Sequence, residues 1–145
     1  SACSTENKPV WGTWPECPLI GEWELESWTN NTDNATQFGE GEKKCDEYPT
    51  NALKINGGKD NYGTYKMTNY TCFKDGSTMR TEIEDGIWTY NGTENQVKVG
   101  TNQQDLRVFN LSYTSDFNYF TVKFTDYYED GSSSRDITEV YKRKQ

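Results

Sequence analysis

A series of short alternating segments, separated by turn sequences, constrains the fold of this chain more than any other feature. Successive side chains of a strand point to opposite faces, so alternation of apolar and polar residues indicates a half-buried strand. The pairs Asn-Gly, Asp-Gly and Gly-Gly recur between these segments and are strong hairpin signals. No amphipathic helix is evident. The pattern therefore predicts an all-β protein built as an antiparallel meander, either a barrel or a sandwich.

Eight strands are expected. The first is GEWELESW at 21–28, in which Trp23 and Leu25 alternate with three glutamates on the solvent side. Trp28 has the parity of the glutamates, so we expect it to lie past a bend or to contact something outside the barrel. The other seven segments are 51–55, 63–70, 86–90, 95–100, 106–114, 118–128 and 135–143.

The composition shows which side chains must form the core. Val, Ile, Leu and Phe make up only 22 of the 145 residues, whereas there are 21 aromatic residues. Aromatic side chains bury large areas, so they are expected to dominate a single core. The net charge of −8 disfavours binding to nucleic acid or to anionic membranes, although it most simply serves solubility. No run approaches the roughly 20 apolar residues of a membrane-spanning helix.

Residues 1–18 are predicted to form an extended N-terminal arm, because this stretch is rich in proline. Trp11 and Trp14 would pin the arm to the barrel, and they are our candidates for the partner of Trp28. A disulfide between Cys3 and Cys17 would close the arm into a loop. The alternative for Cys3 is acylation as in a lipoprotein, with anchoring at the cell surface; we favour the disulfide.

Cysteines and sequons together indicate an extracellular, secreted protein. Four cysteines are compatible with two disulfides in any of three connectivities. Paired cysteines are typical of oxidising compartments, and Asn-x-Ser/Thr sequons mark surface positions that carry sugars in secreted proteins. We predict a glycoprotein, if the host glycosylates such sites, with acceptors at Asn30, Asn34, Asn69, Asn91 and Asn110.

Four motifs occur in an order similar to that of small secreted or lipid-anchored bacterial lipocalin-like domains. They are LIGEWELESW, with Gly21 and Trp23 in the G-x-W positions, CDEYPTNALKINGGKDNYGTYKMTNYTC, DGIWTYNGTENQVKV and FTVKFTDYYEDGSSSRDITEVYKRK. The resemblance implies an antiparallel eight-stranded up-and-down β-barrel over residues 19–145. It also implies that Cys45 pairs with Cys72 and that Trp23 plugs the base of the barrel.

A lipocalin-like domain commonly holds a small apolar molecule inside the barrel, so the resemblance implies a non-catalytic binding protein. Seven aromatic residues are the candidates for a lined cavity. The same side chains could instead fill the core. Because aliphatic residues are scarce, the filled core is the favoured interpretation of these residues. The candidates are Trp23, Trp88, Phe109, Tyr113, Phe120, Phe124 and Tyr141.

Catalytic and metal chemistry find little support. The chain has no histidine, which excludes Ser-His-Asp and Cys-His catalysis and removes the commonest zinc ligand. No metal or cofactor is therefore expected, and we predict that the protein is not an enzyme. No nucleic-acid partner is expected either, because the net charge is negative. The alternative to a carrier is a structural or adhesive subunit of an extracellular assembly or filament, which would self-associate through residues 1–18.

Overall fold

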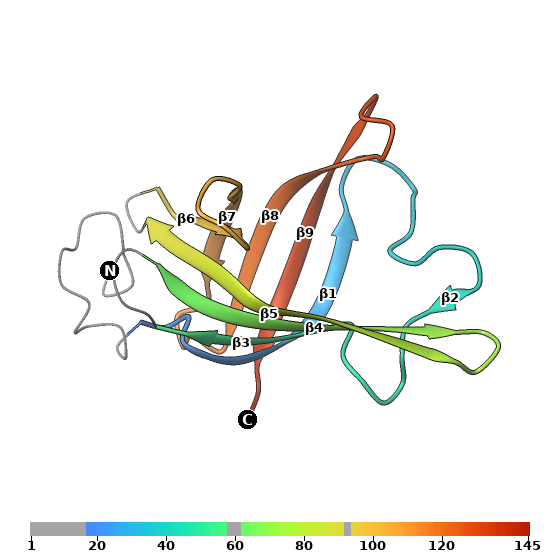
Figure 1. The fold of residues 1–145 in the computed structure, drawn as a ribbon, viewed down its shortest axis with the longest axis horizontal. Helices are drawn as coiled ribbons and strands as arrows, with labels where there is room; N and C mark the ends of the chain where they lie inside the picture. Colours follow the sequence, from blue (N-terminus) through green and yellow to red (C-terminus); the bar gives the residue numbers. More distant parts are fainter. Residues whose placement is uncertain (1–16, 58–61, 92–93) are drawn as a thin grey trace.

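The computed structural model describes residues 17–57, 62–91 and 94–145. The predicted arm, with Cys3, Trp11 and Trp14, falls almost entirely outside these ranges. In these ranges, the regular secondary structure consists of β-strands (Figure 1). The strands are β1 (Gly21–Asn30), β2 (Glu42–Lys43), β3 (Asn51–Asn56), β4 (Gly63–Phe73), β5 (Thr78–Asn91), β6 (Gln96–Gly100), β7 (Arg107–Tyr113), β8 (Tyr119–Tyr127) and β9 (Ser134–Arg143).

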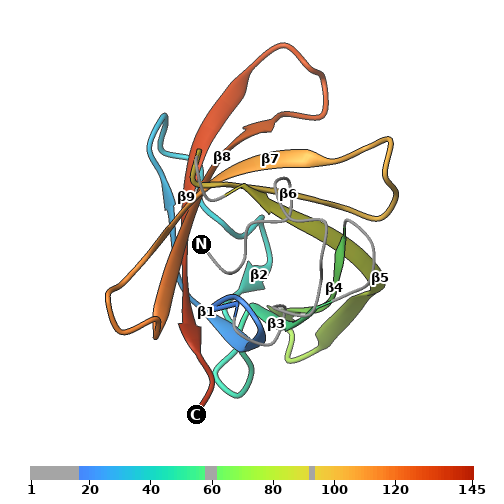
Figure 2. The same cartoon turned by 90° about the vertical axis from the view of Figure 1, so that its left-hand side faces the viewer.

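Eight of these strands close into a barrel. The strand order is β4-β3-β1-β9-β8-β7-β6-β5, and β5 returns to pair with β4, which closes the sheet. Each pairing is antiparallel, and the strands follow one another around the barrel in chain order, with the two-residue β2 added to the far end of β4. Figure 2 shows the closed wall from the end of the barrel. The predicted eight-stranded up-and-down barrel is confirmed.

The strand predictions differ from the structure at two places. β5 begins at Thr78, eight residues before the predicted start, and β2 was not predicted. The first part of β5 pairs with β4 as far as Cys72, but its side chains are mostly polar and exposed, so alternation could not reveal it. A strand of two residues, such as β2, carries no periodicity at all.

Trp28 lies past an irregularity in β1, as expected from its parity. Leu25 pairs with Tyr141 on β9, but Ser27 then pairs with Val140, so one extra residue is accommodated in β1. Such a bulge exchanges the two faces of the strand beyond it. Trp28 therefore pairs with Glu139 on β9 instead of continuing the solvent face of the glutamates.

Trp23 closes one end of the barrel, as predicted. Its side chain is 1% exposed, and its indole Nε1–H donates a hydrogen bond to the Leu19 carbonyl oxygen at 2.9 Å. The ring meets Phe120 edge-on with centroids 4.6 Å apart, and the Arg143 guanidinium lies 4.2 Å from its centre. We call this packed group, together with the backbone around it, the closed end.

Arg143 ties the chain entering the barrel to the chain leaving it. Its guanidinium covers the Trp23 ring, and three backbone carbonyl oxygens accept hydrogen bonds from it. The cation therefore has both an aromatic face and hydrogen-bond acceptors around it. The three acceptors belong to Pro18, Ile20 and Phe117.

The Cys45–Cys72 disulfide is confirmed, with Cα atoms 5.1 Å apart. It joins the segment between β2 and β3 to β4, next to the pairing of β2 with β4. Cys17 is buried and disulfide-bonded, whereas its predicted partner Cys3 lies outside the described residues.

Candidate ligand-binding cavity

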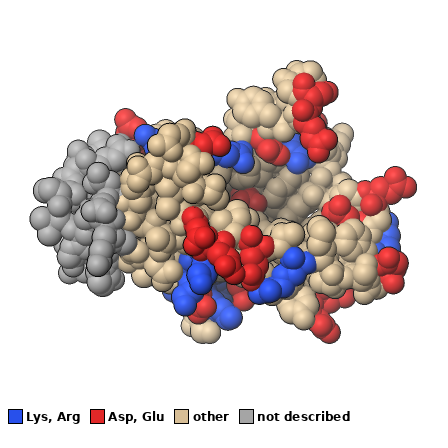
Figure 3. All heavy atoms as spheres, viewed as in Figure 1, with Lys and Arg blue, Asp and Glu red and all other residues tan. Residues whose placement is uncertain are grey.

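The barrel encloses a cavity of about 530 Å³. It extends from Leu19 and Trp88 on the side of the closed end to Thr101, Asp105 and Arg107 near its other limit. Aliphatic and thioether side chains from β3 to β6 line one part of it: Leu53, Ile55, Met67, Ile83, Val97 and Val99. The surface view in Figure 3 shows a hollow near the middle of one face, with acidic and basic side chains around it.

Five of the seven predicted aromatic residues line this cavity. They are Trp88, Phe109, Phe120, Phe124 and Tyr141. The other two lie outside the lining: Trp23 belongs to the closed end, and Tyr113 packs edge-on against Tyr90 and Phe117. Whether the five contact a ligand stays a prediction.

The favoured expectation of a filled core was wrong, and the ring contacts explain why. Phe120 on β8 stacks on Tyr141, its direct partner on β9, with centroids 4.9 Å apart. Phe109 on β7 meets Phe124 on the adjacent β8 at 4.8 Å. In both pairs, each ring packs against a ring from the neighbouring strand of the same wall. Each pair thus places aromatic area between two adjacent strands of the wall.

Two glycines allow further rings to lie close to the wall. Gly63 pairs with Trp88 and Gly86 pairs with Tyr65 across β4 and β5. A Cβ atom on Gly63 would lie 2.4 Å from the Trp88 ring, and one on Gly86 would lie 2.3 Å from the Tyr65 ring. Only glycine permits these approaches. The Trp88 ring is fixed further because its Nε1–H donates to the Asn56 carbonyl oxygen at 3.0 Å.

Several residues that line the cavity are not among the seven sequence candidates. Tyr65 and Met67 share a parity with the sequon residue Asn69, and this made their inward direction hard to reconcile with a sugar on Asn69. In the structure, Tyr65 and Met67 line the cavity, and Asn69 is half-buried with its amide nitrogen donating to Asn51 at 2.7 Å. The parity of the strand residues was therefore the signal that could have identified Tyr65 and Met67 as inward-facing.

Polar side chains form a chain of hydrogen bonds at one part of the cavity wall. The Asn51 amide donates to the Tyr141 hydroxyl at 3.3 Å, and that hydroxyl donates to Glu139 at 3.2 Å. Asn51, Glu139 and Tyr141 all line the cavity. Burial raises the pKa of the Tyr141 hydroxyl well above its ordinary value, and burial also raises the pKa of Glu139. Glu139 was not a candidate in the sequence, although it shares the parity of Ile137 and Tyr141.

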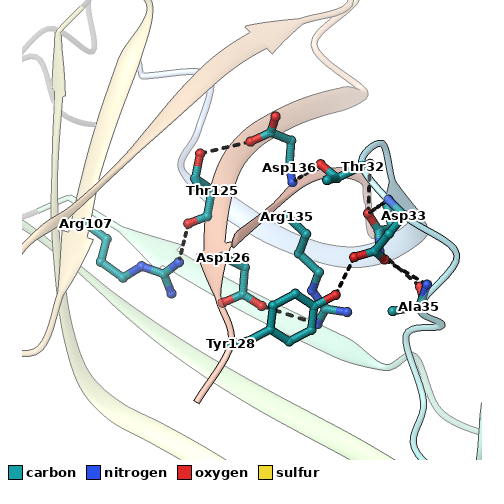
Figure 4. A network of polar contacts seen from close by, with 10 residues as sticks. Thr32, Asp33, Ala35, Arg107, Thr125, Asp126, Tyr128, Arg135 and Asp136 are labelled. Atoms are coloured by element: carbon teal, nitrogen blue, oxygen red, sulfur yellow. Dashed lines mark hydrogen bonds and ion pairs between the residues drawn. The ribbon is translucent and has the colours of Figure 1, made fainter. Parts of the chain in front are cut away.

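Arg107 lies at another part of the wall. Its guanidinium is 5.4 Å from the centre of the Phe109 ring and 5.5 Å from that of Phe124, and it donates to the Thr125 carbonyl oxygen at 3.3 Å (Figure 4). Arg107 and Phe124 also line a second hollow of about 640 Å³. This hollow lies where the pairing of β7 with β8 has ended, beyond Asn110.

A polar network joins the segment after β1 to the β8–β9 hairpin (Figure 4). The Tyr128 hydroxyl donates to Asp33, and this hydrogen bond is the main reason that the pKa of Asp33 is lowered. Arg135 forms an ion pair with Asp126 at 3.3 Å and lies 5.3 Å from the centre of the Trp28 ring. The network holds these segments together beyond the barrel wall.

The sequons lie in different environments. Asn34 and Asn110 are exposed, and Asn110 alternates on β7 with the inward Phe109 and Leu111, as a sugar there would require. The amide nitrogens of Asn30 and Asn69 are engaged in hydrogen bonds. The side chain of Asn91 lies outside the described residues. Glycosylation stays a prediction at all five positions.

Among the described residues, no group of three or more Cys, Asp or Glu side chains could hold a metal ion. Among them there is also no helix with the length and apolar character needed to cross a membrane.

Comparison with known proteins adds little. No family model matches the chain, and no curated protein matches it. Among solved structures it is similar to lobster apocrustacyanin A1, with 17% identity, a TM-score of 0.44, and coverage of 99% of this chain and 72% of the other. At this level the similarity supports no argument about function. The described strands form a closed eight-stranded up-and-down barrel with a cavity, which is the architecture that the motif resemblance implied.

Proposed function

We propose that this protein is an extracellular carrier that binds a small hydrophobic molecule inside its barrel. The observation that carries the proposal is the cavity of about 530 Å³, walled largely by apolar side chains. Protein interiors are normally close-packed, and a void of this size is within the range of small-molecule sites, roughly 300–1,000 Å³. Its lining by aromatic and aliphatic groups with a few polar atoms suits an apolar ligand.

Secretion is supported by the disulfide and by the exposed sequon residues Asn34 and Asn110. A carrier needs no catalytic group, and we propose binding without chemistry. The alternative of a structural or adhesive subunit depends on self-association through residues 1–18, of which only Cys17 and Pro18 are described. It therefore stays a prediction.

The proposal is tested by isothermal titration of the protein with decan-1-ol, an apolar probe with a neutral head. Wild type should bind one molecule. Val99→Phe should weaken binding at least ten-fold, because Val99 lines the cavity and the added ring occupies its volume.

Val108→Phe is the matched control. Val108 lies on the adjacent strand, pairs with Lys98 and is 47% exposed, outside the cavity lining. The affinity of the Val108→Phe variant for decan-1-ol should equal that of wild type. Absence of binding by wild type, or equal binding by folded Val99→Phe, would refute the proposal. Circular dichroism establishes that each variant is folded.

A further inference from the structure

We infer that the cavity selects molecules that carry a protonated amine on an apolar body, and that the Glu139 carboxylate receives the amine. This inference rests on the proposed function and adds a chemical class of ligand to it.

Glu139 is a charged residue in the apolar wall. It lies on β9 between two buried residues of the same parity, Ile137 and Tyr141, and it lines the cavity. Its direct partners across the sheet are Val122 on β8 and Trp28 on β1. A carboxylate is costly to bury without partners. A glutamate here therefore calls for an explanation other than stability.

The carboxylate has unused capacity to accept hydrogen bonds. Tyr141 donates to its Oε1 atom at 3.2 Å. Among the described residues, Glu139 forms no ion pair and accepts no hydrogen bond from another side chain. An ionised carboxylate has about four acceptor sites. The remaining sites are available to a group inside the cavity, and an ammonium offers three donors.

The neighbouring charges favour a cation over an anion. Of the described residues that line the cavity, the positively charged one is Arg107, and it is engaged with the Thr125 carbonyl oxygen and with two aromatic rings. Asp105 adds a second carboxylate to the lining, while Asp126 is paired with Arg135. A ligand carboxylate placed beside Glu139 would meet a like charge there, because Arg107 lies at another part of the wall.

Two more properties of the molecule act in the same direction. Aromatic rings such as those of Tyr141 and Phe120 attract cations through their faces. The net charge of −8 also attracts cationic ligands at long range. Burial raises the pKa of Glu139, with Asp126 acting in the same direction, while Arg107 and the Tyr141 hydroxyl lower it. Binding of an amine should accordingly weaken as the pH falls and Glu139 becomes protonated.

The test compares three probes that share one apolar chain: decylamine, decan-1-ol and decanoate. Isothermal titration at pH 7 should show one-to-one binding of decylamine at least about ten-fold tighter than decan-1-ol, the size expected for one charge-assisted hydrogen bond. Decanoate should bind more weakly than decan-1-ol. Glu139→Gln should abolish the preference for decylamine, measured as the ratio of its affinity to that of decan-1-ol for the same variant.

The control variant is Glu22→Gln, which removes the same charge from an exposed position on β1. It should keep the full preference for decylamine. If decan-1-ol binds but the three probes bind equally, or if Glu139→Gln keeps the preference, the amine inference is wrong and the carrier function stands. If no probe binds, the carrier function fails as well.

Discussion

The two parts of the barrel interior use similar side chains, yet one is packed and the other encloses a cavity. At the closed end, the Trp23 ring meets Phe120 edge-on and is also covered by the Arg143 guanidinium. Around the cavity, Phe120 and Tyr141 stack along the wall as neighbours on adjacent strands. Phe120 belongs to both parts and forms the boundary between them.

The ring contacts differ in which strands they join. Trp23 on β1 meets Phe120 on β8 across the intervening β9, whereas the ring pairs of the cavity wall join adjacent strands. The two glycines facing Trp88 and Tyr65 favour the second arrangement.

Removing the plug should have the largest effect. Trp23→Ala is expected to lower the free energy of unfolding by about 3–5 kcal/mol, the usual loss for a buried tryptophan. It also leaves the Arg143 guanidinium without the ring that it covers. Urea denaturation followed by circular dichroism measures the loss. A decrease below about 1 kcal/mol would show that the closed end is not a packed plug.

The same substitution at two leucines compares the two parts directly. Leu25 is buried and lies outside the cavity lining, whereas Leu53 lines the cavity. Leu25→Ala should cost about 2–4 kcal/mol. Leu53→Ala should cost less, by at least about 1 kcal/mol, because a side chain facing a void has fewer packing contacts to lose. Equal losses in urea denaturation would contradict the presence of the cavity.

Glu139 should lower the stability of the unliganded protein at neutral pH. Its folded-state pKa is raised by burial, so protonation favours the fold. Stability is full below the unfolded pKa of about 4.3 and is lost as the pH rises through the folded pKa. Glu139→Gln should therefore raise the Tm at pH 7, by about 2–4 °C for each kcal/mol recovered.

The difference in Tm between Glu139→Gln and wild type should shrink as the pH is lowered towards 4, where the wild-type glutamate is protonated. Differential scanning calorimetry at several pH values measures it. A lower Tm for Glu139→Gln at pH 7 would mean that the carboxylate stabilises the fold and is not kept for a ligand.

Turn pairs and strand parity are local signals, so they predicted an antiparallel meander, and the resemblance of the four motifs implied that it closes into a barrel. The position of Trp28 past a bend follows from parity alone, whereas the inward direction of Phe109 followed only if Asn110 carries a sugar. The cavity could not be predicted in this way, because it depends on which rings become cross-strand neighbours, and register is a property of the folded sheet. Glu139 has the parity of Ile137 and Tyr141, which indicates a side chain that points inward. It was missed because this parity was not compared with its charge.

The most direct test of the cavity as a binding site uses the two methionines of the chain. Met67 lines the cavity, whereas Met79 on β5 is 47% exposed and outside the lining. With ¹³C-labelled methionine methyl groups, decan-1-ol should shift the Met67 resonance and give nuclear Overhauser contacts between its chain and that methyl. The Met79 resonance should not move. An unchanged Met67 signal at saturating decan-1-ol, or contacts to Met79 alone, would contradict binding inside the barrel.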